Sequence, residues 1–244
     1  MMLTRRTTLA SLALLALSPA ARAEPGHDGV TRRAADGSGK RPAVILLHGS
    51  RGIEINPRAY QRYADALSAK GIDAYLLRYM TETDRAALNS KTSTRESRET
   101  YDTTRFDGWS DTVSATVTSI LGRPDSSGRV GLLGFSLGGF IATNTAARDE
   151  RIAALAVLYG GMPDAAASKV KHMPPMIELH GEADRNVPIA YGKKLIELAK
   201  SVGAEAEFVP YPGKPHGFDF SDTDPMTTDA IDRVSRFFQA RLAG

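Results

Sequence analysis

The stretch Gly134-Phe135-Ser136-Leu137-Gly138 decides the fold that we expect for this chain. It matches the pattern G-x-S-x-G, in which a serine occupies a sharp turn between a strand and a helix. A β-like run over 129–135 precedes it, and a helical stretch rich in small residues follows over 137–147. The two glycines remove side chains where strand and helix would otherwise collide, so the hydroxyl can stand out above the strand. Ser136 is therefore the candidate nucleophile.

Two further stretches offer the base and the acid that a serine needs to become nucleophilic. An apolar run over 176–184 ends in a polar turn that contains Asp184. His216 stands in a segment rich in glycine and proline, after another β-like run. Glu182 and Asp164 also follow predicted strands and are alternatives for the acid. The candidates thus occur in the chain order serine, acid, histidine.

Strand and helix patterns alternate at least six times along the chain. Such alternation predicts an α/β fold, with a parallel sheet and helices on both of its faces. Ligands of these sheets bind at the carboxyl ends of the strands. Ser50 follows the first strongly apolar strand, in the run Leu-Leu-His-Gly-Ser, and so joins Ser136, Asp184 and His216 at that edge.

Together these motifs resemble the α/β-hydrolase superfamily, and most closely its small members similar to dienelactone hydrolase. The resemblance runs from about Pro42 to Leu242 and implies a mostly parallel sheet of about six to seven strands with helices on both faces. It implies Ser136 as the nucleophile and His216 as the general base and then the general acid. Asp184, in the pattern His-Gly-x-x-Asp, is implied as the acid that orients the histidine.

The same resemblance implies an oxyanion hole built from the backbone N–H groups of Leu137 and Ser50. Leu137 also begins the helix after the nucleophile, and the dipole at its N-terminus favours developing negative charge. His48 and His180 each precede a glycine at a predicted strand end. We expect these two histidines to shape their turns by hydrogen bonding rather than to react with substrate.

The chain departs from the family that it resembles in the residues that would recognise a substrate. Dienelactone hydrolases carry a cysteine nucleophile and a glutamate in the first oxyanion loop, where this chain has Ser136 and the segment Ser50-Arg51-Gly52. No arginine follows His216, where the family holds the substrate carboxylate. Arg51 and Arg78 lie near strand ends and are the candidate substrate-binding residues, with a solvated surface arginine as the alternative at each position.

Composition and charge indicate one globular domain of enzyme size, in which 42% of the 244 residues are hydrophobic and 24% are charged. The formal net charge is +3, but three arginines without any acidic residue lie in the first 23 positions, and the remainder is neutral. Nothing in the charge therefore suggests a nucleic-acid partner. The chain has no cysteine and no ligand cluster at metal-binding spacing, so neither a metal nor another cofactor is expected.

The first 23 residues have the pattern of an export signal. Arg5 and Arg6 form a basic start, an apolar run covers 9–17, and Ala21-Arg22-Ala23 is a small-x-small cleavage site. The run is shorter than the about 20 residues that cross a bilayer, so no membrane anchor is expected after cleavage. The arginine pair predicts the twin-arginine route, with an ordinary secretory signal as the alternative. We expect a periplasmic or secreted protein.

Residues 24–41 are expected to be a polar lead-in, and 42–244 the α/β-hydrolase domain. Within that domain, 79–107 shows almost no apolar periodicity, which predicts a long loop of functional importance. The implied function is an exported serine hydrolase that cleaves a small ester-like substrate through an acyl-enzyme. A lactonase like the dienelactone hydrolases, a serine peptidase and an acyltransferase use the same triad, and a catalytically silent ligand-binding protein is the alternative from another class.

Overall fold

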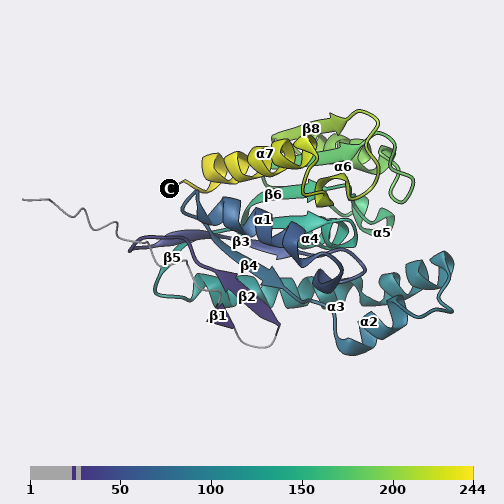
Figure 1. The fold of residues 1–244 in the computed structure, drawn as a ribbon, viewed down its shortest axis with the longest axis horizontal. Helices are drawn as coiled ribbons and strands as arrows, with labels where there is room; N and C mark the ends of the chain where they lie inside the picture. Colours follow the sequence, from purple (N-terminus) through teal and green to yellow (C-terminus); the bar gives the residue numbers. More distant parts are fainter. Residues whose placement is uncertain (1–23, 26–28, 244) are drawn as a thin grey trace, which may run out of the picture.

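The computed structural model describes residues 24–25 and 29–243, which fold around one twisted sheet (Figure 1). The eight strands follow the order β1-β2-β4-β3-β5-β6-β7-β8. Six of them are parallel: β3 (Arg41–Leu47), β4 (Asp73–Leu77), β5 (Ser126–Phe135), β6 (Ile152–Leu158), β7 (Met176–Gly181) and β8 (Ala206–Tyr211). The predicted α/β class with a mostly parallel sheet is confirmed. The predicted export signal, 1–23, lies outside the described residues.

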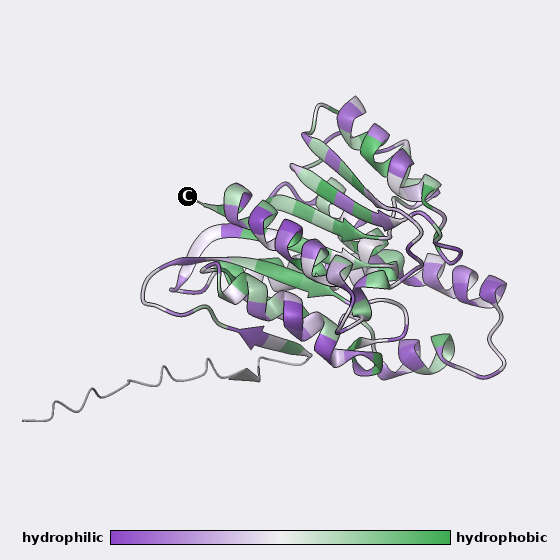
Figure 2. Cartoon of the chain, turned by 45° about the horizontal axis from the view of Figure 1, so that its top comes forward, coloured by the Kyte–Doolittle hydropathy of each residue, from purple (hydrophilic) through white to green (hydrophobic). Residues whose placement is uncertain are grey.

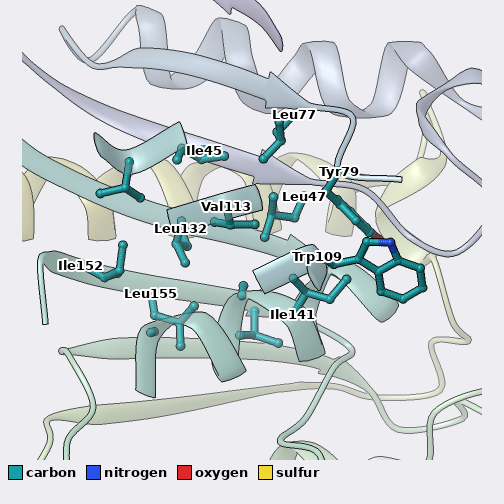
Figure 3. Close-up of a cluster of buried hydrophobic side chains, with 14 of the residues drawn as sticks. Ile45, Leu47, Leu77, Tyr79, Trp109, Val113, Leu132, Ile141, Ile152 and Leu155 are labelled. Carbon is teal, nitrogen blue, oxygen red and sulfur yellow. The ribbon is translucent and has the colours of Figure 1, made fainter. Parts of the chain in front are cut away.

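Helices cover both faces of the sheet, because the six parallel strands bury apolar side chains on both sides. One core lies beneath α3 (Arg95–Leu121), α4 (Leu137–Arg148) and α6 (Ala190–Ser201). The other lies beneath α1 (Pro57–Ser68) and α7 (Pro225–Leu242). Figure 2 shows the apolar strands enclosed by helices whose outer faces are polar, and Figure 3 shows the first core from Ile45 to Trp109. No helix among the described residues has the length and apolar character needed to cross a bilayer.

Polar side chains cap the starts of α1 and α7. The Asn56 side chain accepts a hydrogen bond from the Ala59 N–H, and Pro57 opens α1. Asp224 accepts one from the Met226 N–H, and Pro225 opens α7. In both cases an oxygen satisfies an N–H that the helix leaves without an acceptor.

The expectation of a long loop over 79–107 is wrong. This segment contains α2 (Glu82–Leu88) and the first half of α3, each begun by a threonine whose side chain caps the helix. Both helices extend past the edge of the sheet (Figure 1), and most of their side chains face solvent. An exposed helix needs no apolar stripe, which is why the periodicity is missing.

A buried carboxylate, Asp84, holds these two helices together. It accepts hydrogen bonds from the Tyr101 hydroxyl at 2.8 Å, the Trp109 indole N–H at 3.0 Å and Nε of Arg105 at 2.8 Å. Burial alone would raise the pKa of Asp84. These hydrogen bonds outweigh burial and hold the pKa well below its usual range. The Tyr79 ring packs edge-on against Trp109, so the helix pair is tied to the end of β4.

The polar lead-in is part of the sheet. Its strand β2 (Val30–Arg33) pairs antiparallel with β4, and the two-residue β1 (Glu24–Pro25) pairs with β2. Arg32 forms ion pairs with Asp73 and Asp125. Charged side chains near the edge of a sheet discourage pairing with another chain, and this fits the polar sequence of the lead-in. Short helices α5 (Asp164–Ala167), η1 (Ile53–Ile55) and η2 (Phe218–Phe220) complete the fold.

Candidate active site

Ser136 occupies a strained turn between β5 and α4. Its backbone has φ 53° and ψ −121°, in the region that favours glycine. Such a conformation costs about 1–3 kcal/mol and persists only where the surroundings enforce it. They do so through close packing: a Cβ on Gly138 would lie 2.2 Å from the Leu47 carbonyl oxygen, and one on Gly134 would lie 2.3 Å from the Gly138 oxygen. The turn raises the Ser136 hydroxyl above the sheet at the carboxyl ends of its strands.

The three predicted catalytic side chains meet at this edge. Nε2 of His216 lies 2.9 Å from Oγ of Ser136, and Nδ1 of His216 lies 2.7 Å from Oδ2 of Asp184. An ionised carboxylate only accepts hydrogen bonds, so Nδ1 carries the proton and Nε2 is the acceptor for the serine O–H. Neither Glu182 nor Asp164, the alternative acids, bonds to His216 within the described residues.

Asp184 is held in a fixed orientation by the turn that follows β7. Its Oδ1 accepts hydrogen bonds from the backbone N–H groups of Asn186 at 2.8 Å and Val187 at 2.9 Å, which leaves Oδ2 to face His216. The side chain is buried, and burial opposes ionisation. Hydrogen bonds from His180, His216 and the Val187 N–H outweigh burial and hold the pKa of Asp184 well below its usual range.

Of the two predicted oxyanion donors, Leu137 directly follows the serine, and Ser50 belongs to a loop that packs against it. Leu137 is the first residue of α4, so its N–H has no acceptor within the helix. The loop that contains Ser50 touches the elbow, because a Cβ on Gly49 would lie 3.5 Å from Cβ of Ser136. Gly49 itself donates its N–H to the Tyr60 hydroxyl at 3.2 Å, whereas Ser50 donates its N–H to no other described residue.

His48 and Tyr79 shape this loop. Nδ1 of His48 lies 2.8 Å from the Gly49 oxygen, and the Tyr79 hydroxyl donates to the His48 oxygen at 2.7 Å. The two rings stack with their centroids 4.4 Å apart. Burial lowers the pKa of His48 to about 4, so the ring is neutral near pH 7. A neutral, buried histidine that binds its own turn agrees with the structural role expected for it.

The candidate substrate-binding arginines differ in their surroundings. Arg51 is exposed in the turn after Ser50 and forms no ion pair with the described residues. Arg78 directly follows β4, and its Nε lies 3.0 Å from Oε1 of Glu54. The same oxygen of Glu54 lies 3.3 Å from Arg85. Arg78 is therefore already engaged by a carboxylate, and Arg51 is not.

Sequence reasoning missed a buried network behind His216. The Tyr159 ring lies against the His216 ring, with centroids 4.5 Å apart. The hydroxyls of Tyr159 and Tyr63 each donate to Asp219 at 2.8 Å, and burial raises the pKa of this carboxylate. Asp219 is three residues after His216, which is a local signal, but its tyrosine partners are 60 and 156 residues away. Only the packing of β6 and α1 brings them together.

A sequence model of the dienelactone hydrolase family matches residues 30–242. The chain belongs to the dienelactone hydrolase family. Family membership makes it a hydrolase of the α/β-hydrolase fold. Its described residues contain no group of three or more His, Asp or Glu side chains that could hold a metal ion.

Individual relatives are distant. A Methylorubrum extorquens protein assigned as a carboxymethylenebutenolidase is 28% identical over 106 residues, which cover 40% of this chain and 36% of that protein. The matched region thus spans about a third of that relative's length. The crystal structure of dienelactone hydrolase from Anabaena variabilis superposes with a TM-score of 0.68 at 22% identity, over 88% of this chain and 92% of the other. Esterase PE8 gives a TM-score of 0.68 at 16% identity, over 86% and 97%. These likenesses establish the fold.

Proposed function

We propose that this protein is a serine hydrolase that cleaves carboxylic esters of small molecules through an acyl-enzyme. The observation that carries the proposal is the continuous hydrogen-bonded chain from Asp184 through His216 to Ser136, with contacts of 2.7 and 2.9 Å. Membership of a hydrolase family supports hydrolysis as the reaction class. Stabilisation of an oxyanion is supported by the Leu137 N–H, which directly follows Ser136, and by the loop of Ser50, which packs against Ser136 through Gly49.

The first half of the proposed reaction acylates the serine. Oγ of Ser136 forms a bond to the ester carbonyl carbon while its proton passes to Nε2 of His216. The carbonyl electron pair moves to the oxygen, which receives hydrogen bonds from Leu137 and Ser50. When this pair returns, the bond from the carbonyl carbon to the alkoxy oxygen breaks, and His216 delivers the proton to the departing alcohol.

The second half releases the acid. Water gives a proton to Nε2 of His216 and bonds to the acyl carbon, and a second oxyanion occupies the same donors. Collapse breaks the bond to Oγ, and the proton returns from His216 to Ser136. Asp184 stays ionised throughout and stabilises the imidazolium that forms twice. The cycle consumes one water and regenerates the enzyme.

Lactone hydrolysis is the second candidate, and the family match favours it. A lactone is a cyclic ester, so the same steps would open it and leave the alcohol attached to the product. Serine depends wholly on its base for nucleophilicity, and a neutral short-chain ester needs only the triad and two backbone donors. We therefore propose small aryl or alkyl esters as the preferred substrates and a dienelactone as a poor one.

A fluorophosphonate probe tests the nucleophile directly. We expect stoichiometric labelling of Ser136, identified by peptide mass, and no labelling of the Ser136→Ala variant. Losing Ser136 or His216 should lower kcat on p-nitrophenyl acetate by on the order of a million-fold. Asp184→Asn should cost less, about ten-thousand-fold, because the histidine remains but loses its orientation. A label on another serine, or full activity of Ser136→Ala, would refute the mechanism.

We also propose that the protein is exported, on the basis of the basic start, the apolar run and the small-x-small site within 1–23. A periplasmic or secreted enzyme would meet its substrate outside the cytoplasm.

A further inference from the structure

A second histidine–carboxylate pair lies directly beneath Asp184. Glu178 and His180 both belong to β7, and both side chains are completely buried. Nδ1 of His180 lies 2.7 Å from Oε1 of Glu178, and Nε2 lies 2.8 Å from the carbonyl oxygen of Val187. The same Nε2 lies 3.5 Å from Oδ2 of Asp184. The triad mechanism uses neither residue.

The contacts of His180 limit how many protons this pair can hold. A carbonyl oxygen only accepts hydrogen bonds, so Nε2 must carry a proton to make the Val187 contact. Nδ1 faces a carboxylate oxygen at 2.7 Å, so a proton must lie between these two atoms as well. A neutral imidazole beside an ionised Glu178 provides only one of the two protons. The pair therefore carries both, either as imidazolium and carboxylate or as imidazole and carboxylic acid.

We propose that Glu178 and His180 are positioning residues that hold Asp184 in line with His216, with His180 as an imidazolium that donates from both ring nitrogens. The proposal rests on the proposed roles of Asp184 and His216. Through Nε2, His180 closes the turn from Asp184 to Val187, whose N–H groups bind Oδ1 of Asp184. Its positive charge, 3.5 Å from Oδ2, attracts the carboxylate that faces His216.

The surroundings of Glu178 favour the ionic form of the pair. The first turn of α6 lies against its carboxylate, because a Cβ on Gly192 would fall 2.6 Å from the carboxyl carbon. A helix N-terminus stabilises negative charge. Burial disfavours both charges, because it raises the pKa of Glu178 and opposes protonation of His180. For His180, the nearby carboxylates of Asp184 and Glu178 outweigh burial and raise the pKa to about 9.

Stability alone does not explain this pair. Oε2 of Glu178 is buried and has no hydrogen-bond partner among the described residues. Replacing a buried ion pair with apolar side chains is often neutral or stabilising, because burying two charges is costly. The contact that gives this costly pair a purpose is the one with the catalytic acid, whose Oδ2 lies 3.5 Å from Nε2 of His180.

Few other charges face the pair. Asp184 approaches from the loop after β7, and Glu178 lies on the strand of His180 itself. His216, in the loop after β8, contacts Asp184. From α6 the contact is with Gly192, which does not titrate. The hydroxyl of Tyr159, whose ring touches His216, is bound to Asp219.

Glu178→Gln tests the proposal, because glutamine keeps the shape and can donate to Nδ1, which leaves His180 neutral. We expect kcat on p-nitrophenyl acetate to fall about 10-fold with KM within about 2-fold, because the group positions a catalytic residue without touching substrate. The acid limb of the kcat/KM profile should move to higher pH. The Asp184 charge, no longer shared with a second cation, then binds the imidazolium of His216 more tightly.

Asp73→Asn is the matched control. Asp73 is another buried carboxylate, at the start of β4 and the opposite edge of the sheet, bound by Arg41 and the Ala35 N–H. The Asp73→Asn variant should have a lower Tm and an unchanged pH profile of kcat/KM. If Glu178→Gln also lowers Tm and leaves both kcat and the acid limb unchanged, the pair is structural and the proposal is wrong.

A measurement without catalysis separates this proposal from the proposed function and does not require Glu178→Gln to fold. In ¹⁵N-labelled Ser136→Ala protein at pH 7, both ring nitrogens of His180 should carry a directly bonded proton. Finding only one would refute the imidazolium. If the fluorophosphonate fails to label Ser136 while both ring nitrogens of His180 carry protons, the proposed serine mechanism is wrong but the imidazolium state of His180 is confirmed.

Discussion

Two glycines, Gly181 at the end of β7 and Gly138 at the start of α4, allow the catalytic segments to pack closely. A Cβ on Gly181 would lie 2.2 Å from the Lys214 carbonyl oxygen, so the turn that contains Asp184 is packed directly on the loop that contains His216. In the same way, a Cβ added to Gly138 would collide with backbone atoms at the end of β3. The obstructing atoms belong to the backbone and cannot rotate away, so each contact tolerates only glycine.

Gly181→Ala should therefore separate the acid from the base. We expect a loss of about 1–3 kcal/mol in the free energy of unfolding, as for overpacking elsewhere, and a fall in kcat beyond what partial unfolding explains. Urea denaturation and kinetics on the same preparation measure both. Gly108→Ala is the control: it lies inside α3 with no atom within 4 Å of the place that an added methyl would take, so it should gain about 0.5–1 kcal/mol. Equal changes in the free energy of unfolding and in kcat for the two variants would show that close packing at Gly181 is not required.

Arg51 is exposed and unpaired within the described chain, and a neutral ester does not need it. We expect Arg51→Ala to change kcat/KM for p-nitrophenyl acetate by less than about 10-fold, or about 1.4 kcal/mol of transition-state stabilisation. The same two proteins should be assayed on a dienelactone. A strong preference for the dienelactone that collapses in the variant would show that Arg51 binds a substrate carboxylate, against the general-esterase proposal.

His48 should make the protein less stable in mild acid. The pKa of His48 is about 4 in the folded state and 6.5 in an unfolded chain. The contribution of the neutral ring to the free energy of unfolding is therefore present above pH 6.5 and is lost as the pH falls toward 4. His48→Asn, whose amide can still bind the Gly49 oxygen, removes this titration. Between pH 6.5 and 4, the Tm of the variant should fall less steeply than that of the parent. Parallel curves would show that His48 does not titrate as described.

At the scale of elements, α2 and the first half of α3 form a helical pair that depends on one carboxylate. Asp84→Ala should lower the free energy of unfolding by about 3 kcal/mol, because it leaves the buried Trp109 N–H and the half-buried donors of Tyr101 and Arg105 without this acceptor. Hydrogen exchange should quicken first in these two helices. Asp107→Ala, also on α3, removes only a surface ion pair with Arg148 and should change stability by less than about 0.5 kcal/mol. A uniform increase in exchange across the sheet would contradict the local role of Asp84.

At the scale of the whole molecule, the basic residues that unbalance the charge lie in 1–23, where we propose an export signal. Changing both Arg5 and Arg6 to lysine should block export if the twin-arginine route is used. An ordinary secretory signal would tolerate the change, because lysine keeps the positive charge. Fractionation followed by N-terminal sequencing should place the mature start at Glu24. Unchanged export of the double variant would rule out the twin-arginine route and leave the signal itself in place.

Local chemistry determined what could be predicted from the sequence. The alternation of strand and helix and the serine turn after β5 each depend on residues within a few positions of one another. Parallel strands end at one edge, so the candidates Ser136, Asp184 and His216 were expected there, and the structure brings them together. Family membership followed from the same motifs.

Tertiary structure alone decided the features whose partners are far apart or whose helices face water. The helices over 79–107 lack an apolar stripe because they extend past the sheet, so periodicity gave no sign of them. Asp219 is buried only because two tyrosines from distant elements reach it. Glu178 lies among apolar residues in β7, next to the edge strand β8. Only the packing of α6 and the turn after β7 makes it a partner of His180 and, through His180, of Asp184. A buried polar side chain must be satisfied by whatever the fold places beside it, and that neighbour is absent from its local sequence.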